Sequence, residues 1–284
     1  MPMLGQLATS FAREQRARGL SPHTIKLYRD VLARLIRFLG DDLDAMTRRN
    51  LTDFFAVRLD TVQATTVSID FRVIRVFAKW LVIESELTTN PMENIKGPRQ
   101  TAKPVPVLTD DQIKRLLAAC SGRDQRSLRD TAILRLAIDT GCRRGELSTL
   151  SIRDLDLDEN LARVTGKTGT RIVPFRATTA IALDRWLRQR PKSVGDSVNS
   201  GDSVFRLTPS GLAQAFKERA RQAEVDAHIH QLRHTFAANW LAAGGQEGDL
   251  LQLGGWTSRV MLDRYGASTR AQRSIEAYRR LSTE

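Results

Sequence analysis

Apolar side chains recur at helical spacing through most of the first hundred positions. Ser21 and Pro22 predict a helix start, because serine caps helix N-termini well and proline fits the first helical position. The apolar positions that follow recur every three or four residues until Gly40, and they are Ile25, Tyr28, Leu32, Leu35 and Leu39. Two more helices are predicted, over 47–58 and 65–83. The pattern therefore favours a bundle of helices.

The composition changes after this predicted bundle, which covers residues 1–95. Residues 96–107 hold three prolines, a glycine and three cations, which is typical of an extended linker. The linker could lie along a phosphate backbone or serve only as a spacer. A second domain is predicted over 108–284, where Thr109 and Gln112 have capping-box spacing. Its further elements are two short strands within 160–175 and helices over 109–120, 125–139, 177–189, 209–224, 231–242 and 246–253.

The charge of the chain adds an expected partner to this outline. The 284 residues carry a net charge of +12, with 41% hydrophobic and 27% charged residues. Nucleic acid is the expected partner, because Lys and Arg that neutralise phosphates release counterions, although an inert basic surface has the same composition. The N-terminus resembles no signal peptide, and no stretch approaches the roughly 18 apolar residues of a membrane span. With two cysteines that lack metal or disulfide spacing, the sequence predicts a cytoplasmic protein without membrane contact.

Five polar residues with reactive or anion-binding side chains stand apart in the second domain, and they are Arg143, Lys167, His230, Arg233 and Tyr265. Taken singly, each has an ordinary explanation. Arg143 fits a solvated helix start, Lys167 a hairpin tip, and Tyr265 a core tyrosine with a hydrated hydroxyl. Residues of these types carry chemistry only if the fold brings them together.

Four segments connect these residues: TGCRRGEL at 140–147, GKTGTRIVP at 166–174, HQLRHTFA at 230–237, and LGGWTS at 253–258 followed by Tyr265. Their content and order resemble the motifs of tyrosine recombinases of the phage integrase type. The resemblance extends over about 108–270, and the helical N-terminal part resembles the family's core-binding, SAM-like DNA-binding domain.

The resemblance implies a mainly α (α+β) fold in the Xer or Cre layout. We expect a helical core-binding bundle and a mostly helical catalytic domain with a small antiparallel sheet, which together form a C-shaped clamp on DNA. The implied function is site-specific recombination, in which DNA strands are cleaved and rejoined through a 3′-phosphotyrosine on Tyr265.

The residue types suit this chemistry. Attack on a phosphodiester builds negative charge on the non-bridging oxygens, and two fixed guanidiniums, Arg143 and Arg233, can stabilise that charge through bidentate hydrogen bonds. The resemblance implies that Lys167 protonates the leaving 5′ oxygen and that His230 acts as general base or acid near Tyr265.

Two further positions complete the predicted site. Trp256 stands where many relatives have His; its indole has one N–H donor and no acceptor, so it can hold a phosphate oxygen but cannot shuttle a proton. We expect Glu146 to orient Arg143 or a neighbouring side chain. His228, His230 and His234 suggest a metal site, but no carboxylate or cysteine is nearby to complete one. The sequence predicts no metal and no cofactor.

The expected partner is double-stranded DNA at specific recombination sites. The apolar positions Ile275, Tyr278 and Leu281 predict a C-terminal helix that would dock on a neighbouring subunit, which implies a homotetramer on paired sites, or would pack on its own domain. Two alternative functions are a type IB topoisomerase-like enzyme and a non-catalytic DNA-binding regulator. The sequence leaves open the target site, accessory proteins, and the choice among phage integration, plasmid resolution and chromosome-dimer resolution.

Overall fold

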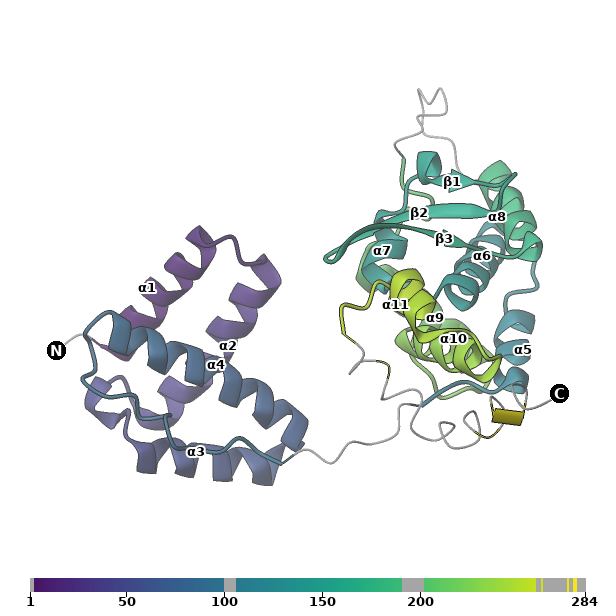
Figure 1. Ribbon diagram of the computed structural model, residues 1–284. Coiled ribbons are helices and arrows are strands. Elements are labelled where there is room, and N and C mark those ends of the chain that lie inside the picture. The colour runs from purple at the N-terminus through teal and green to yellow at the C-terminus, as the bar shows by residue number, and fades with distance from the viewer. Residues whose placement is uncertain are drawn as a thin grey trace. The chain divides into compact units, whose positions relative to one another are not determined.

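The computed structural model describes residues 3–99, 106–190 and 202–258, together with the single residues 262, 275, 278 and 279. The chain divides into two compact units, Met1–Ala102 and Lys103–Glu284 (Figure 1). Each unit has an apolar core of its own. The fold is mostly helical with one small antiparallel sheet, as the sequence predicts.

The N-terminal unit is built from α-helices joined by short turns, with a 3₁₀ turn, η1, at Leu43–Ala45. The helices are α1 (Leu4–Ala17), α2 (Pro22–Leu39), α3 (Arg48–Thr61) and α4 (Ala64–Ile83). The predicted start of α2 is confirmed, because the Ser21 hydroxyl accepts a hydrogen bond from the Thr24 amide at 3.2 Å. The predicted stop is confirmed as well, since Gly40 takes a φ of 84°, which glycine adopts without strain.

The core of this unit combines an aromatic cluster with one buried carboxylate. Phe11 stacks on Tyr28 at a ring distance of 5.7 Å and meets Phe77 edge to face at 5.3 Å. Asp70 of α4 is only 1% exposed and accepts hydrogen bonds from Arg34 of α2 at 2.7 Å and from Arg58 of α3 at 3.0 Å. These two ion pairs fasten three helices to one another.

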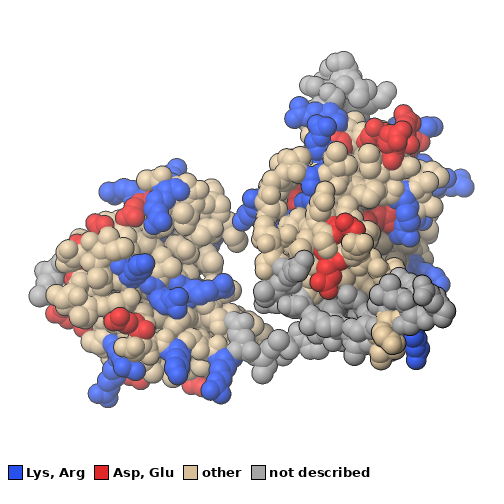
Figure 2. Space-filling model, in the orientation of Figure 1, with Lys and Arg blue, Asp and Glu red and all other residues tan. Residues whose placement is uncertain are grey.

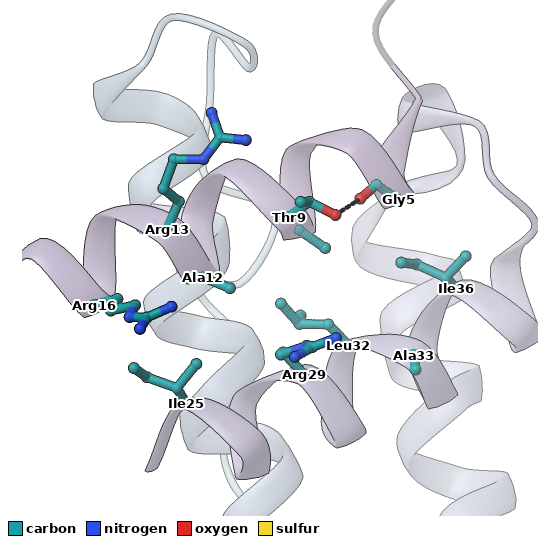
Figure 3. A pocket seen from close by; sticks show the side chains of 11 residues that line it. Gly5, Thr9, Ala12, Arg13, Arg16, Ile25, Arg29, Leu32, Ala33 and Ile36 are labelled. Atoms are coloured by element: carbon teal, nitrogen blue, oxygen red, sulfur yellow. Dashed lines mark hydrogen bonds between the residues drawn. The ribbon is translucent and has the colours of Figure 1, made fainter. Parts of the chain in front are cut away.

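An open pocket of about 460 Å³ lies between α1 and α2 (Figure 3). Small residues of α1, such as Gly5 and Ala12, form one wall of the pocket. Arg13 and Arg16 from α1 and Arg29 from α2 also line it. The pocket therefore brings three cations to the surface of the N-terminal unit.

The second unit combines several helices with the small sheet (Figure 1). Its helices are α5 (Asp110–Ala118), α6 (Gln125–Thr140), α7 (Arg144–Thr149), α8 (Ala177–Gln189), α9 (Pro209–Gln222), α10 (His230–Ala242) and α11 (Glu247–Gly254), with a 3₁₀ turn, η2, at Ile152–Asp154. The capping box before α5 is confirmed, since the Thr109 and Gln112 side chains each accept the other's backbone N–H. Helix α6 packs against α8, α9 and α10 and thereby connects much of the core.

The sheet has the order β1 (Leu155–Asp156), β2 (Leu161–Gly166), β3 (Gly169–Pro174), and all its pairs are antiparallel. Gly166 pairs with Gly169, so Lys167 and Thr168 form a two-residue turn. This hairpin confirms the prediction of two short strands within 160–175, and a glycine flanks its turn on each side. The sequence pattern did not predict α7 or β1, which are both too short to produce a clear period. Across the part of the chain that the structure describes, no helix has the length and apolar character needed to cross a membrane.

Candidate active site

The predicted site residues lie on separate elements of the second unit. Arg143 immediately precedes α7, Lys167 occupies the β2–β3 turn, and Arg233 lies on α10, with His230 at the start of the same helix. Trp256 follows α11. Tyr265 lies outside the described residues.

The C-terminal end of α11 brings three arginines together. Three successive backbone carbonyls each accept a hydrogen bond from a different guanidinium: Leu253 O from Arg171 Nε at 2.7 Å, Gly254 O from Arg233 Nη2 at 2.6 Å, and Gly255 O from Arg143 Nη2 at 2.7 Å. The last carbonyls of a helix have no partner within the helix and carry its negative partial charge. The sequence therefore folds so that the end of one helix orients three cations.

Glu146 is the anion at the centre of this cluster. It is 3% exposed, and its two oxygens accept from Arg171 Nη1 and Nη2 at 2.9 and 2.8 Å. Arg143 adds its side-chain Nη1 at 2.9 Å and its backbone N–H at 2.7 Å. Burial raises the pKa of the Glu146 carboxyl, but the hydrogen bonds and charges of Arg171 and Arg143 outweigh burial and lower that pKa to about 2. Glu146 is thus ionised at neutral pH and holds two of the three arginines.

Arg233 is almost completely enclosed, with 2% of its surface exposed. Its Nη1 donates to Gly141 O at 2.7 Å, and its guanidinium carbon lies 3.9 Å from the centre of a Trp256 ring. A guanidinium over an indole face gains cation–π attraction in addition to packing. Gly254 makes room for this stack, since a Cβ there would lie 1.8 Å from Trp256 Cζ3.

Arg143 differs from Arg233 in its exposure. About a third of its side chain stays exposed (31%), while Glu146 and Gly255 O fix the direction of its guanidinium. Gly255 has a φ of 62° and ends α11 in the left-handed conformation that favours glycine. The turn at Gly255 therefore presents its carbonyl to Arg143.

His230 is close enough to the arginines for their charge to affect it. Desolvation by the surrounding protein and the positive charge of Arg233 lower the pKa of His230, and Arg143 acts in the same direction. Its ring meets the ring of His234, one turn further along α10, edge to face at 4.6 Å. Burial and the charge of His230 lower the pKa of His234 to about 4. His230 is therefore mostly neutral at pH 7 and can accept a proton.

The hairpin reaches the same end of α11. The Thr168 hydroxyl donates to Gly255 O at 3.3 Å, and Arg171 of β3 anchors the hairpin nearer its base. Lys167 immediately precedes Thr168 in the turn and is exposed. The turn thus places Lys167 beside the site while leaving its ammonium group accessible.

Between Trp256 and Tyr265 the structure describes Thr257, Ser258 and Leu262. Leu262 is 2% exposed and packs with Trp256, Leu241 and Leu250 in a small apolar cluster between α10 and α11. Since Leu262 precedes Tyr265 by three positions, the chain is anchored in this cluster shortly before the predicted nucleophile.

The described residues contain no group of three or more His, Cys, Asp or Glu side chains arranged to hold a metal ion. Cys142 adjoins Arg143 in the chain but is buried, and burial raises the pKa of its thiol to about 11. The thiol is therefore un-ionised at neutral pH and a poor nucleophile. The buried positive charge in this site belongs to Arg171 and Arg233.

Arg171 belongs to the GKTGTRIVP motif at 166–174, but the motif alone predicted no function for this side chain. A signal was available, because alternation along β3 places Arg171 on the same face as the buried Val173. A cation on the core-facing side of a strand requires a buried anion, and Glu146 is that anion.

Comparison with known proteins agrees with this geometry. The model of the phage integrase family matches residues 106–272, and that of the phage integrase N-terminal SAM-like domain matches residues 7–87. Tyrosine recombinase XerC of Alcanivorax borkumensis is 32% identical over 247 residues, which are 84% of this chain and 80% of that protein. Tyrosine recombinase XerA of Saccharolobus solfataricus is 29% identical and covers 86% of this chain and 81% of its own length.

Solved structures share the fold at lower identity. The Tn1549 transposon integrase in complex with transposon right end DNA matches with a TM-score of 0.76 and 19% identity, over 97% of this chain and 99% of that one. The XerH recombinase bound to its palindromic difH substrate matches with a TM-score of 0.74 and 20% identity, over 93% and 81%. A lambda integrase tetramer bound to a Holliday junction has a TM-score of 0.73 and 17% identity, over 91% and 78%.

Proposed function

This chain belongs to the phage integrase family of tyrosine recombinases, and we propose that it recombines DNA at specific sites through a covalent bond to Tyr265. The observation that carries the proposal is the arrangement at the end of α11, where Arg143 and Arg233 are fixed by neighbouring backbone carbonyls. Such preorganised cations can stabilise a phosphorane-like transition state without rearranging.

We propose a cleavage step in which one bond to phosphorus forms as another breaks. The Tyr265 phenol oxygen attacks the scissile phosphorus, the bond from phosphorus to the 5′ oxygen breaks, and a 3′-phosphotyrosine forms. His230, held neutral by its surroundings, takes the phenol proton. Lys167 on the exposed turn gives a proton to the departing 5′ oxygen. Attack by a 5′ hydroxyl reverses each transfer and rejoins the strand without an external energy source.

The arginines have unequal parts in this mechanism. Arg143 keeps about a third of its side chain exposed (31%), so we assign it the direct contact with a non-bridging oxygen. Arg233 lies deeper, against Trp256, and contributes its positive charge. Trp256 packs the segment that leads to Tyr265, and Glu146 orients Arg143.

We assign residues 1–95 to DNA binding, 96–107 to a linker and 108–284 to catalysis. Lys and Arg side chains lie at several places on the visible face of the N-terminal unit, interspersed with Asp and Glu, and these cations can contact phosphates (Figure 2). The proposed assembly is a homotetramer on two sites. Ile275 and Tyr278 support it, since both are helical and largely exposed at 48% and 72%, as a docking surface for a neighbouring subunit requires.

The two alternative functions gain no support from the matches with known proteins. A DNA-binding regulator would have no use for a buried carboxylate that orients Arg143 and Arg171 at the end of α11. A type IB topoisomerase-like enzyme would share Tyr265 but would relax supercoils without site preference, so the experiment below also tests sequence selectivity.

Covalent capture tests the proposal. Wild type and Tyr265→Phe are incubated with a pool of nicked random-sequence duplexes, and products that migrate slowly on a denaturing gel and shift after protease treatment are sequenced. We expect a covalent product with wild type only and enrichment of one sequence. Equal binding by both chains without any covalent product would support the regulator, and capture without enrichment would support the topoisomerase. A covalent product with Tyr265→Phe would assign the nucleophile elsewhere.

A further inference from the structure

Arg171 is the most fully tied of the three arginines at the end of α11. Its side chain is 9% exposed, and all three guanidinium nitrogens donate: Nη1 and Nη2 to Glu146 and Nε to Leu253 O. Every nitrogen of its guanidinium is therefore bound by a protein acceptor, Glu146 or Leu253 O. Its buried charge therefore serves another part of the protein.

The part that Arg171 fixes is the β2–β3 hairpin. Arg171 stands two residues beyond Gly169, where the Lys167–Thr168 turn ends, and it pairs with Val164 across the hairpin. Through Glu146 it attaches β3 to the start of α7, and through Leu253 O it attaches β3 to the end of α11. The turn itself is attached to the end of α11 by a long, exposed hydrogen bond of 3.3 Å from the Thr168 hydroxyl to Gly255 O. Of the side-chain hydrogen bonds described between the hairpin and α7 or the end of α11, Arg171 therefore makes three and Thr168 makes one.

We propose that Arg171 is a positioning residue that holds the hairpin against Glu146 and the end of α11, so that Lys167 reaches the leaving 5′ oxygen. This inference rests on the proposed function, in which Lys167 is the proton donor. Lysine cannot replace arginine here, because a single ammonium group cannot span both carboxylate oxygens and a carbonyl with fixed geometry. Glu146 keeps two hydrogen bonds from Arg143 in the absence of Arg171, so Arg143 stays oriented.

A sulfur-substituted substrate isolates the proton donor. The duplex obtained by covalent capture is prepared in two forms, with oxygen or with sulfur at the bridging 5′ position of the scissile phosphate. A thiolate leaves without protonation near neutral pH, because a thiol has a pKa of about 8.5 and an alcohol a far higher one. The ratio of the two cleavage rates therefore reports proton donation alone. Loss of folded protein affects both rates equally and cancels in the ratio.

We expect Lys167→Ala and Arg171→Gln each to slow cleavage of the oxygen duplex by about 100-fold or more, in the range of general-acid catalysis. On the sulfur duplex both variants return to within roughly threefold of wild type. Arg171→Lys shows the same change of ratio, with a smaller loss on oxygen. Arg163→Gln is the matched control, since it removes an exposed arginine from β2 of the same hairpin, and it leaves both rates unchanged.

Two results would overturn the inference alone. In the first, Arg171→Gln loses the same factor on both duplexes while Lys167→Ala recovers on sulfur, which means that Arg171 serves the fold or Arg143. In the second, Arg171→Gln cleaves the oxygen duplex at the wild-type rate. If Lys167→Ala itself fails to recover on sulfur, the assignment of Lys167 as proton donor is wrong and the inference about Arg171 falls with it, while covalent capture by Tyr265 still supports the proposed function.

Discussion

Both units of this protein contain a carboxylate buried between two arginines, and two of these carboxylates, Asp70 and Glu146, serve different ends. In the N-terminal unit Asp70, 1% exposed, receives one hydrogen bond each from Arg34 and Arg58. In the second unit Glu146, 3% exposed, receives three side-chain bonds from Arg143 and Arg171 and one backbone bond. Both pairs satisfy the rule that a buried charge needs a partner.

The two arrangements differ in the other hydrogen bonds that their arginines make. The two cations on Asp70 connect helices α2 and α3 to α4, and the described side-chain hydrogen bonds of Arg34 and Arg58 end at the carboxylate. The two cations on Glu146 continue to the carbonyls of Leu253 and Gly255, beside the third arginine and Trp256. A buried ion pair can therefore hold helices together or orient the side chains of a reactive site. The further hydrogen bonds of its arginines distinguish the two roles.

The strongest test of this comparison removes each charge in turn. We expect Asp70→Asn to lower the free energy of unfolding by about 3 kcal/mol or more, since it leaves two guanidiniums without their anion, and to leave the cleavage rate of the folded fraction unchanged. We expect Glu146→Gln to slow cleavage by about 100-fold or more, because Arg143 loses its fixed direction. Urea unfolding and single-turnover cleavage at saturating DNA measure the two effects.

The exposed pair Arg188–Asp184 offers a control for the charge change itself. Asp184→Asn alters an exposed i,i+4 pair, and such pairs contribute about 0.5 kcal/mol or less. Both measurements should therefore stay near wild type. The comparison between Asp70 and Glu146 is wrong if Asp70→Asn slows cleavage of folded protein as much as Glu146→Gln does.

Much of the fold follows from local pattern, and the helix boundaries show why. Ser21, Gly40 and the Thr109 capping box act within a few residues of themselves, so their effect can be predicted from neighbours alone. Helix α7 and strand β1 were not predicted, because six and two residues complete too few periods to be recognised. Their place is decided by packing against distant parts of the chain.

The candidate site shows a similar division. The reactive side chains could be named from their motifs, because the chemistry selects residue types such as Arg143 and His230. The carbonyls that orient the arginines could not, because a backbone oxygen has no residue type. Arg171 was overlooked for a related reason: its partner Glu146 lies 25 positions away, and only the fold brings them together. The assignment of roles in this site, including that of Tyr265, stays a prediction.

Lowering the pH gives a second test of the buried Glu146 carboxylate, with a smaller expected effect. The pKa of Glu146 is lowered from 4.5 to about 2 in the folded chain. Because the folded value is the lower one, ionised Glu146 stabilises the fold above pH 4.5, and this contribution disappears as pH falls from 4.5 through about 2. We expect the difference in unfolding free energy between wild type and Glu146→Gln to narrow by about 2 kcal/mol from pH 6 to pH 3. Urea titrations at both pH values measure it, and a constant difference would show that the carboxylate is not held as described.

The smallest expected effect is that of Thr168 on the cleavage rate, and it tests whether the hydrogen-bond network around Glu146 includes the hairpin turn. The Thr168 hydroxyl is exposed and donates to Gly255 O at 3.3 Å, the same carbonyl that accepts from Arg143. Thr168→Val keeps the shape of the side chain and removes this bond, and a weak exposed bond of this kind corresponds to about a two- to threefold slower cleavage. Thr165→Val is the matched control, because its hydroxyl meets Thr170 at 3.0 Å within the hairpin and does not contact α11. Equal cleavage rates for the two variants would show that the Thr168 bond does not contribute and that Arg171 is the outermost residue of the network. A tenfold loss for Thr168→Val alone would show that Thr168, and not Arg171, mainly holds the turn against α11.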